Sequence, residues 1–189
     1  MNVHCWAPLL LCVVGTLYAG DSPLRPGLGE VPGTYDVRIC KGSCSDAKPD
    51  DVVVRGFVVL ESKEFDVAEI MEPIRSVFDY GYSWDDKPSG CFVLETLKQN
   101  RTYAGITDIG FTHWSWYKGE LRFGLYSSPD AWYTTHVTMS EDGFTGQGVS
   151  SGAGVAAPPD WGTDVVVGRR TGPQDRMKCI RVAIQRLPK

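Results

Sequence analysis

The stretch of residues 112–139 constrains the fold most, because its apolar residues keep to one face through successive turns. A two-residue turn at Lys118-Gly119 would join two short antiparallel strands. The spacing then pairs two tryptophans with apolar residues of the next strand: Trp116 with Leu121, and Trp114 with Phe123. Indole and aliphatic side chains share one layer, which predicts a hairpin with a single core face.

The same face continues beyond this hairpin. A loop of odd length over residues 127–131 carries it onward to Tyr133, Val137 and Met139. The alternate residues are left on the outer face: Trp132, Thr134, His136 and Thr138. Successive strands therefore form an antiparallel meander.

A further tight turn at Asp142-Gly143 begins the next strand, residues 144–150. This strand would place Phe144, Gly146 and Gly148 inward. Glycine inside a strand marks a bend or the close approach of another segment. The spacing therefore indicates the curvature of a barrel.

Four more segments have the alternation or the β-branched content of strands: 35–39, 52–60, 164–170 and 178–187. Eight or nine strands are expected in all. We predict a mainly β fold, an antiparallel barrel, because closure removes the exposed edges of a flat sheet. A β-sandwich is the alternative. Pairing of the first and last strands would close the barrel.

One short helical insertion interrupts the strands. Between residues 61 and 80 the apolar period changes to three or four residues. Pro73 is expected to kink or divide this helix. The stripe consists of Phe65, Ala68, Met71, Ile74 and Phe78.

The N-terminal residues have the pattern of a cleaved export signal. Residues 1–19 contain no Lys, Arg, Asp or Glu and end in a small residue, Ala19, at the predicted cleavage point. Residues 20–32 then form an irregular lead-in, and residues 33–188 a single β domain. The mature chain is expected to be secreted or periplasmic, with no transmembrane segment after cleavage. The net charge of -4 gives no attraction for nucleic acid.

Four cysteines of the mature chain are expected to form disulfides, because export places them where disulfides persist. Closure of the barrel by its first and last strands favours Cys40 with Cys179 and Cys44 with Cys91. The opposite pairing, Cys40 with Cys44 and Cys91 with Cys179, fits the spacing nearly as well.

Several segments resemble a lipocalin-like barrel: Gly33-Thr34-Tyr35 at the first strand, Gly162-Thr163-Asp164-Val165 before a late strand, and Arg181 near the end. Lipocalins carry Gly-x-Trp where this chain has Gly-x-Tyr, and their helix follows the strands. The chain is also similar to uncharacterised exported proteins of Gram-negative bacteria, which share a Cys-x-Gly-x-Cys segment after the first strand. The resemblance implies a fold and no particular activity.

The sequence holds no complete catalytic or metal-binding pattern, and we predict no catalytic residue, metal or cofactor. Residues 148–152 match the G-x-S-x-G string of serine hydrolases, but no helix-forming segment and no later histidine accompany Ser150. A small hydrolase of the cell envelope is the alternative reading. Its candidate residues would be Ser150, His113, His136 and Asp108.

Aromatic residues supply the candidate ligand-binding site, since exposed aromatics often mark binding surfaces. Three follow the helical insertion, which would act as a lid, and two lie on or near the outer face of the meander: Tyr80, Tyr82, Trp84, Tyr126 and Trp132. We predict an exported, non-enzymatic binding or interaction protein. Its partner would be a small apolar ligand or another envelope protein. A structural envelope component acting through protein contacts is a further alternative.

Overall fold

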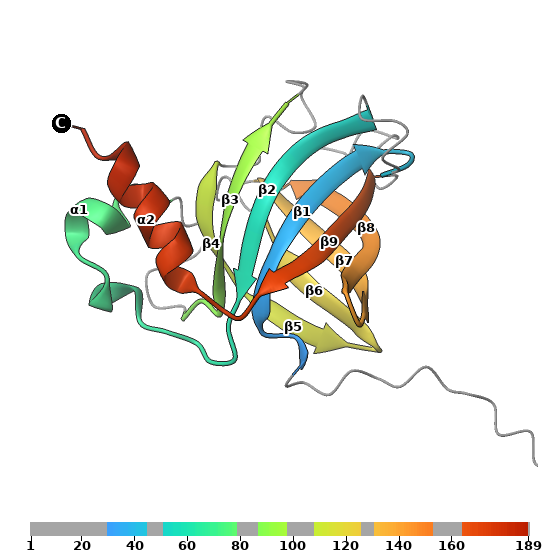
Figure 1. Cartoon of the computed structure of the whole chain (residues 1–189), viewed down its shortest axis with the longest axis horizontal. Coiled ribbons are helices and arrows are strands. Elements are labelled where there is room, and N and C mark those ends of the chain that lie inside the picture. The colour runs from blue at the N-terminus through green and yellow to red at the C-terminus, as the bar shows by residue number, and fades with distance from the viewer. Residues whose placement is uncertain are drawn as a thin grey trace, which may run out of the picture.

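Nine strands form one antiparallel sheet that curls into a nearly closed barrel (Figure 1). The computed structural model describes residues 30–44, 51–78, 87–97, 108–125, 131–152 and 164–188. The predicted signal peptide and most of the lead-in lie outside these residues. The strands are β1 Gly33–Lys41, β2 Val52–Leu60, β3 Gly90–Thr96, β4 Ile109–Thr112, β5 Trp114–Tyr117, β6 Glu120–Gly124, β7 Ala131–Ser140, β8 Gly143–Gly152 and β9 Asp164–Gly172.

Two features close the sheet. The first strand, β1, pairs antiparallel with β9 over most of its length. Only His113 separates β4 from β5, so this bent segment pairs with β3 on one side and β6 on the other. The Thr112 hydroxyl donates to the Gly124 carbonyl at 2.5 Å and ties the bend to β6. The predicted barrel is confirmed, and the sandwich alternative is not the fold.

The register predicted for the hairpin around Lys118-Gly119 is confirmed. Trp114 lies opposite Phe123 and Trp116 opposite Leu121. Lys118 and Gly119, at the turn, both have positive φ values, 51° and 86°. Such values are those of a type I′ turn, whose twist suits a two-residue hairpin. Leu121 and Phe123 are buried, so the predicted core face is the face that the barrel encloses.

Aromatic side chains fill the barrel interior. The ring of Phe144 lies 5.1 Å from that of Tyr35 and 5.3 Å from that of Phe123, measured between centroids. A Cβ atom at Gly148 would collide with the Tyr133 hydroxyl, and one at Gly168 would collide with the Phe144 ring. Glycine at these inward positions therefore makes room for rings.

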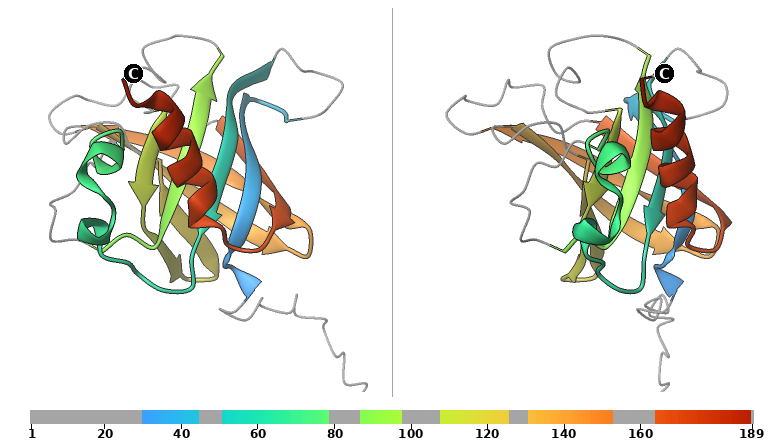
Figure 2. Two further views of the ribbon diagram at one scale, coloured as in Figure 1. Left: turned by 60° about the vertical axis from the view of Figure 1, so that its left-hand side comes forward. Right: turned by 90° about the vertical axis from the view of Figure 1, so that its left-hand side faces the viewer.

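A second apolar core lies outside the barrel, where helices cover β2, β3 and β4 (Figure 2). These are the 3₁₀ turn η3 Val67–Glu69 and the helices α1 Glu72–Arg75 and α2 Arg176–Arg186. Phe78 stacks on Phe111 at 4.3 Å between centroids. Val58 faces the barrel core and Val59 the second core, so β2 is covered on both sides, as its sequence predicts.

The predicted helical insertion is confirmed as short turns, with Pro73 in the first turn of α1. The strand predicted at 178–187 is wrong, because these residues form α2. Ile180, Val182 and Ile184 alternate in the sequence as in a strand, but residues two apart in a helix point to nearly opposite sides. Cys179 and Ala183, four residues apart, are the two that α2 buries, which is helical spacing.

The disulfides join Cys40 to Cys44 and Cys91 to Cys179, so the favoured pairing is wrong and its alternative is confirmed. The cause is the last segment. Since it is a helix on the outer side of β3, Cys179 lies beside Cys91, and the residue opposite Cys40 on the closing strand is Val165.

An arginine closes one end of the barrel. The Arg170 guanidinium lies over the Tyr35 ring, 5.3 Å from its centroid, and donates to the Tyr35 hydroxyl at 2.8 Å. Tyr35 in turn donates to the carbonyl of Val31, at 2.6 Å, and the Val31 side chain is fully buried. Arg181, which is part of the resemblance to lipocalins, does not take this place: it lies on α2 and pairs with Asp175. Burial raises the pKa of Tyr35 above its ordinary 10.0, against the opposing effect of Arg170.

Removal of each disulfide should cost a different free energy of unfolding. The two bonds span 88 and 4 residues. Loop-closure entropy predicts that Cys91→Ala/Cys179→Ala loses about 4.5 kcal/mol and Cys40→Ala/Cys44→Ala about 2 kcal/mol. Urea unfolding of both variants measures the difference. Equal losses of unfolding free energy would contradict the role of Cys91–Cys179 as the long-range bond that ties α2 to β3.

Tyr35→Phe should lower stability in a pH-dependent way. At pH 7 the lost hydroxyl leaves the Val31 carbonyl without its donor, at a cost of about 1 to 2 kcal/mol. Protonated Tyr35 contributes its full stabilisation of the fold at a pH below the pKa that tyrosine has in the unfolded chain. This contribution is lost as the pH rises through the higher pKa of Tyr35 in the folded protein. The difference in stability between wild type and Tyr35→Phe, measured by thermal unfolding, should therefore become smaller above about pH 10. A difference in stability that stays constant up to about pH 11 would refute this role for Tyr35.

Candidate binding surface

The aromatic residues predicted to bind a ligand are not tested by the structure. Tyr80, Tyr82, Trp84 and Tyr126 lie outside the described residues. Trp132 lies in β7, opposite Ser151, and its side chain is not among those described. The role of the helical insertion as a lid over these aromatic residues therefore stays a prediction.

The described part of the barrel interior is packed. Phe92, Leu121 and Leu125 are fully buried, and their surfaces leave no space that a water molecule could enter. Val31 joins this cluster at the end where Tyr35 and Arg170 meet. Among the described core residues, the interior serves as a hydrophobic core and leaves no room for a ligand beside them.

The hydrolase candidates do not converge. Ser150 lies opposite Tyr133 and His136 opposite Gln147, three positions apart on the β7–β8 hairpin. That separation is about 10 Å along a strand, too far for a serine to share a proton with a histidine. Residues 148–152 continue β8, so Ser150 lies within a strand and not at a turn from a strand into a helix. Asp108 lies before β4 and pairs with Arg186 of α2 at 3.8 Å.

His136 belongs to an outward charge cluster on β6 and β7. The Glu120 carboxylate accepts from Arg122 at 3.2 Å and lies 3.5 Å from the His136 Nδ1. The hydrogen bond from Arg122, with a smaller contribution from His136, lowers the pKa of Glu120. The cluster lies on the outer face, as predicted for His136. It holds two neighbouring strands together and forms no cleft.

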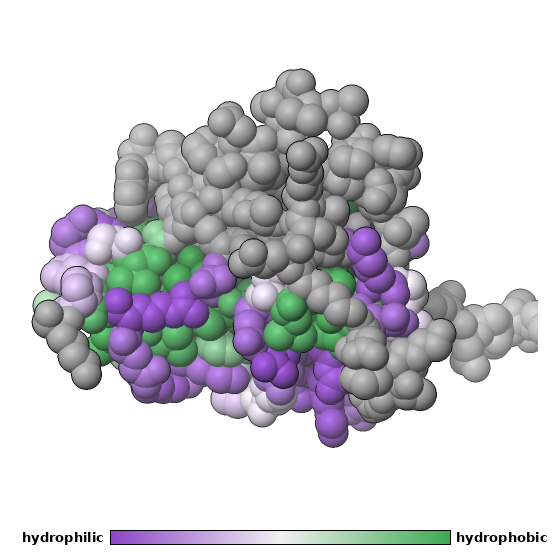
Figure 3. All heavy atoms as spheres, turned by 90° about the horizontal axis from the view of Figure 1, so that it is seen from above, coloured by the Kyte–Doolittle hydropathy of each residue, from purple (hydrophilic) through white to green (hydrophobic). Residues whose placement is uncertain are grey.

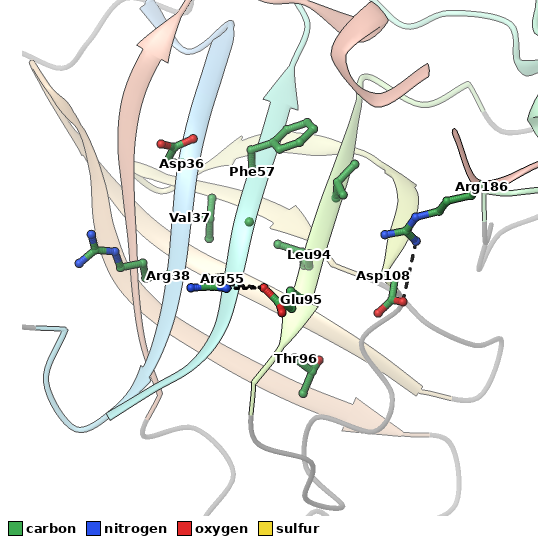
Figure 4. A pocket seen from close by; sticks show the side chains of 12 residues that line it. Asp36, Val37, Arg38, Arg55, Phe57, Leu94, Glu95, Thr96, Asp108 and Arg186 are labelled. Atoms are coloured by element: carbon green, nitrogen blue, oxygen red, sulfur yellow. Dashed lines mark hydrogen bonds and ion pairs between the residues drawn. The ribbon is translucent and has the colours of Figure 1, made fainter. Parts of the chain in front are cut away.

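A charged groove of about 910 Å³ lies between the outer face of β1–β3 and the C-terminal end of α2 (Figure 4). Arg55 points at Glu95, with 2.8 Å between Nη2 and Oε2, and Arg186 reaches across to Asp108. Both ion pairs are exposed, and the two charges within each pair neutralise each other. No histidine or cysteine is among its lining residues. The groove therefore offers charged and polar contacts.

A second groove, about 500 Å³, lies between α1 and α2, and we call it the helical groove. It is lined by Glu61, Glu69, Ile70, Met71, Ile74, Gln174, Asp175, Arg176, Met177 and Ile180. Met71 is 70% exposed and Met177 is 51% exposed. Large apolar side chains in a groove, rather than scattered singly, are typical of binding surfaces. Methionine suits such a surface, because its flexible side chain adapts to a partner.

Helix α2 carries two apolar stripes. Cys179 and Ala183 face the outer side of the barrel and are fully buried. Met177, Ile180 and Ile184 follow at three- and four-residue spacing on another side, and Ile184 is 48% exposed. A surface helix needs only one stripe to pack on its own fold. Ile180 packs in part against the second core, whereas Met177 and Ile184 remain exposed and exceed what the fold requires.

The space-filling view shows hydrophobic surface at the side of the molecule where α1 and α2 lie (Figure 3). Hydrophilic side chains cross it. The helices α1 and α2 pack on the sheet at this side of the molecule. The disulfide between Cys179 and Cys91 fixes α2 to β3.

Comparisons with protein-family models, with curated proteins and with solved structures found no significant match. In the part of the chain that the structure describes, no three His, Cys, Asp or Glu side chains come together as a metal site would require. Neither described helix has the length and apolar content needed to cross a membrane.

The sequence interpretation missed the helical groove, because it treated 178–187 as a strand. The signal was present in the spacing of Met177, Ile180 and Ile184, which fits a helical stripe. A period of two fits the same segment through Ile180, Val182 and Ile184. The two readings differ in whether Met177 or Val182 lies on the same side as Ile180 and Ile184.

The two stripes of α2 should differ in their effect on stability. Met177→Gln should change the free energy of unfolding by no more than about 0.5 kcal/mol, because the side chain is exposed. Ala183→Gln should cost at least about 2 kcal/mol, since a larger polar group must enter a packed core. Urea unfolding compares the two. A large loss in Met177→Gln would show that the fold itself needs this side chain.

Proposed function

We propose that the protein is an exported, non-enzymatic interaction protein that binds a partner protein through the helical groove. The observation that supports this most is a contrast within one molecule. The described barrel interior is packed, whereas Met71 and Met177 stay exposed and both line the helical groove. Apolar side chains that the fold leaves in water favour association with another surface.

The proposal of export rests on two supports. Residues 1–19 have the pattern of a signal peptide. Two disulfides, one of them fully buried, suit an oxidising compartment outside the cytoplasm. A secreted or periplasmic location follows from both. The partner would then be a protein of the same compartment.

A lipocalin-like classification is also a proposal, and it concerns the fold. A helix, α2, follows the last strand, where lipocalins carry theirs. Tyr35 occupies the position of their tryptophan and receives Arg170 at one end of the barrel. These features support the resemblance. They carry no ligand with them, because the interior beside Tyr35 is filled.

Binding of a neutral solvatochromic dye, Nile red, tests the proposed surface. The folded wild type should bind it with a blue shift, and Met71→Gln/Met177→Gln should weaken binding roughly tenfold, from the loss of about 1.4 kcal/mol of apolar contact. Leu97→Gln is the matched control, since Leu97 is 41% exposed at the end of β3. It should leave binding unchanged.

Two results would contradict the proposal. One is the absence of dye binding to the folded wild type. The other is dye binding that Met71→Gln/Met177→Gln leaves unaltered, since the apolar site would then lie elsewhere, for example near the predicted residues Tyr126 and Trp132.

A further inference from the structure

The two disulfides differ in their exposure to solvent. Cys91 and Cys179 are fully buried, and so is Cys40. Cys44, in contrast, is partly exposed, and residues 41–43 before it are all exposed. Access decides which sulfur of a disulfide a thiol in solution can attack. Of the four bonded cysteines, Cys44 is therefore the one that such a thiol reaches.

The space around the loop that this bond closes is open. Gly42 has a positive φ of 85°, and a Cβ atom added there would meet no atom of the described residues within 4 Å. The turn is tight, since the Ser43 amide donates to the Lys41 carbonyl at 3.2 Å. The described chain therefore leaves the tip of the loop uncovered.

Strand pairing holds the two bonded cysteines to different degrees. Cys40 lies in β1 and is paired on both sides, opposite Val52 of β2 and Val165 of β9. Cys44 follows the end of β1, and its Sγ lies 3.5 Å from the Val165 carbonyl oxygen and 3.8 Å from that of Arg38. When the bond opens, Cys40 stays in place, and a Cys44 thiol can donate to these carbonyls and remain beside it.

Opening this bond should leave the fold intact. Cys40 and Cys44 are four residues apart, whereas Cys91 and Cys179 are 88 residues apart. A short loop restrains the unfolded chain less, so the bond that closes it contributes less to stability. Exposed disulfides are commonly the exchangeable ones, and buried disulfides resist reduction. The first bond therefore suits reversible exchange, and the second suits permanent support of the fold.

We propose that Cys44 is a thiol-exchange site, where a low-molecular-weight thiol forms a mixed disulfide with this chain. The incoming thiolate attacks the Cys44 sulfur, the Cys40–Cys44 bond breaks, and Cys40 leaves with the electron pair and takes a proton from water. In the reverse step the Cys40 thiolate attacks Cys44 and expels the small thiol, so no oxidant is consumed. A small thiol is favoured over a protein thiol, because Cys44 is only partly exposed and its sulfur lies against two strands.

This site lies apart from the proposed partner surface. The end of β1 and the helices α1 and α2 lie on opposite sides of the molecule (Figure 1). Neither cysteine of the bond, nor Arg38 or Val165 beside Cys44, lines the helical groove. The inference therefore goes beyond the proposed function and does not depend on it.

Treatment of the folded, oxidised protein with reduced glutathione at about 5 mM tests the site. Acid quenching at intervals, alkylation of the unfolded chain and peptide mass mapping then locate each sulfur. We expect glutathione on Cys44, an alkylated Cys40 and an intact bond between Cys91 and Cys179. The exposed bond should open at least about a hundredfold faster than the buried one, because buried sulfur is reached only when the chain unfolds.

Cys40→Ser and Cys44→Ser form a matched pair of variants, since each removes the same bond and leaves one thiol. With oxidised glutathione, the Cys44 thiol of the first variant should form an adduct at least about tenfold faster than the Cys40 thiol of the second, because only Cys44 is exposed. Thermal unfolding checks that both variants are folded. If either is unfolded, the wild-type measurement decides alone.

Three results would overturn the inference. One is glutathione attached to Cys40 of the wild type instead of Cys44. Another is that both disulfides of the folded wild type open at similar rates, or that neither opens. The third is that the two folded variants form adducts at equal rates, since exposure would then not distinguish the two sulfurs.

Discussion

The pairing of β1 with β9 is the constraint on which the rest of the structure depends. Through it the sheet closes, and side chains from both halves of the chain meet inside: Tyr35 from β1 against Phe144 from β8. Closure also determines where the chain leaves the barrel. From the end of β9 it emerges beside the outer face, so α2 covers β3 and the buried Cys91–Cys179 bond becomes possible.

Two cores result, and they have different consequences. The inner core is enclosed by strands, and its described aromatic rings pack against one another. The outer core is a single layer of helix and turn on the sheet, so part of each helix remains in water. Exposed apolar side chains therefore gather on α1 and α2, where Met71 and Met177 lie. The outer layer is where we propose that a partner binds, because one side of its helices packs on the sheet and the other side faces water.

Covalent support makes the outer layer suitable for contact. An isolated helix of the length of α2 is marginal in water, and α1 is a single turn. The disulfide at Cys179 and the pair between Glu61 and Arg176 hold α2 against the barrel. A surface ordered in advance loses less conformational entropy when a partner binds.

Much of the barrel was determined by the sequence itself. Alternation in β1, the turn at Lys118-Gly119 and the inward glycines of β8 are local patterns, and each predicted its strand, register or curvature correctly. Local patterns suffice there because a strand with one buried face must alternate, and a two-residue turn sets the register of its hairpin. Strands β3 and β4 were not located, because both of their faces are covered and no alternation marks them.

Only the tertiary structure decided between the two readings of residues 178–187 and, with them, the disulfide pairing and the helical groove. A short segment such as Cys179 to Ala183 fits a period of two and a period near four equally well. The choice depends on what the segment packs against, and that is the outer face of β3, 88 residues earlier in the chain. Contacts over such separations are set by closure of the barrel, and no local window of sequence contains them.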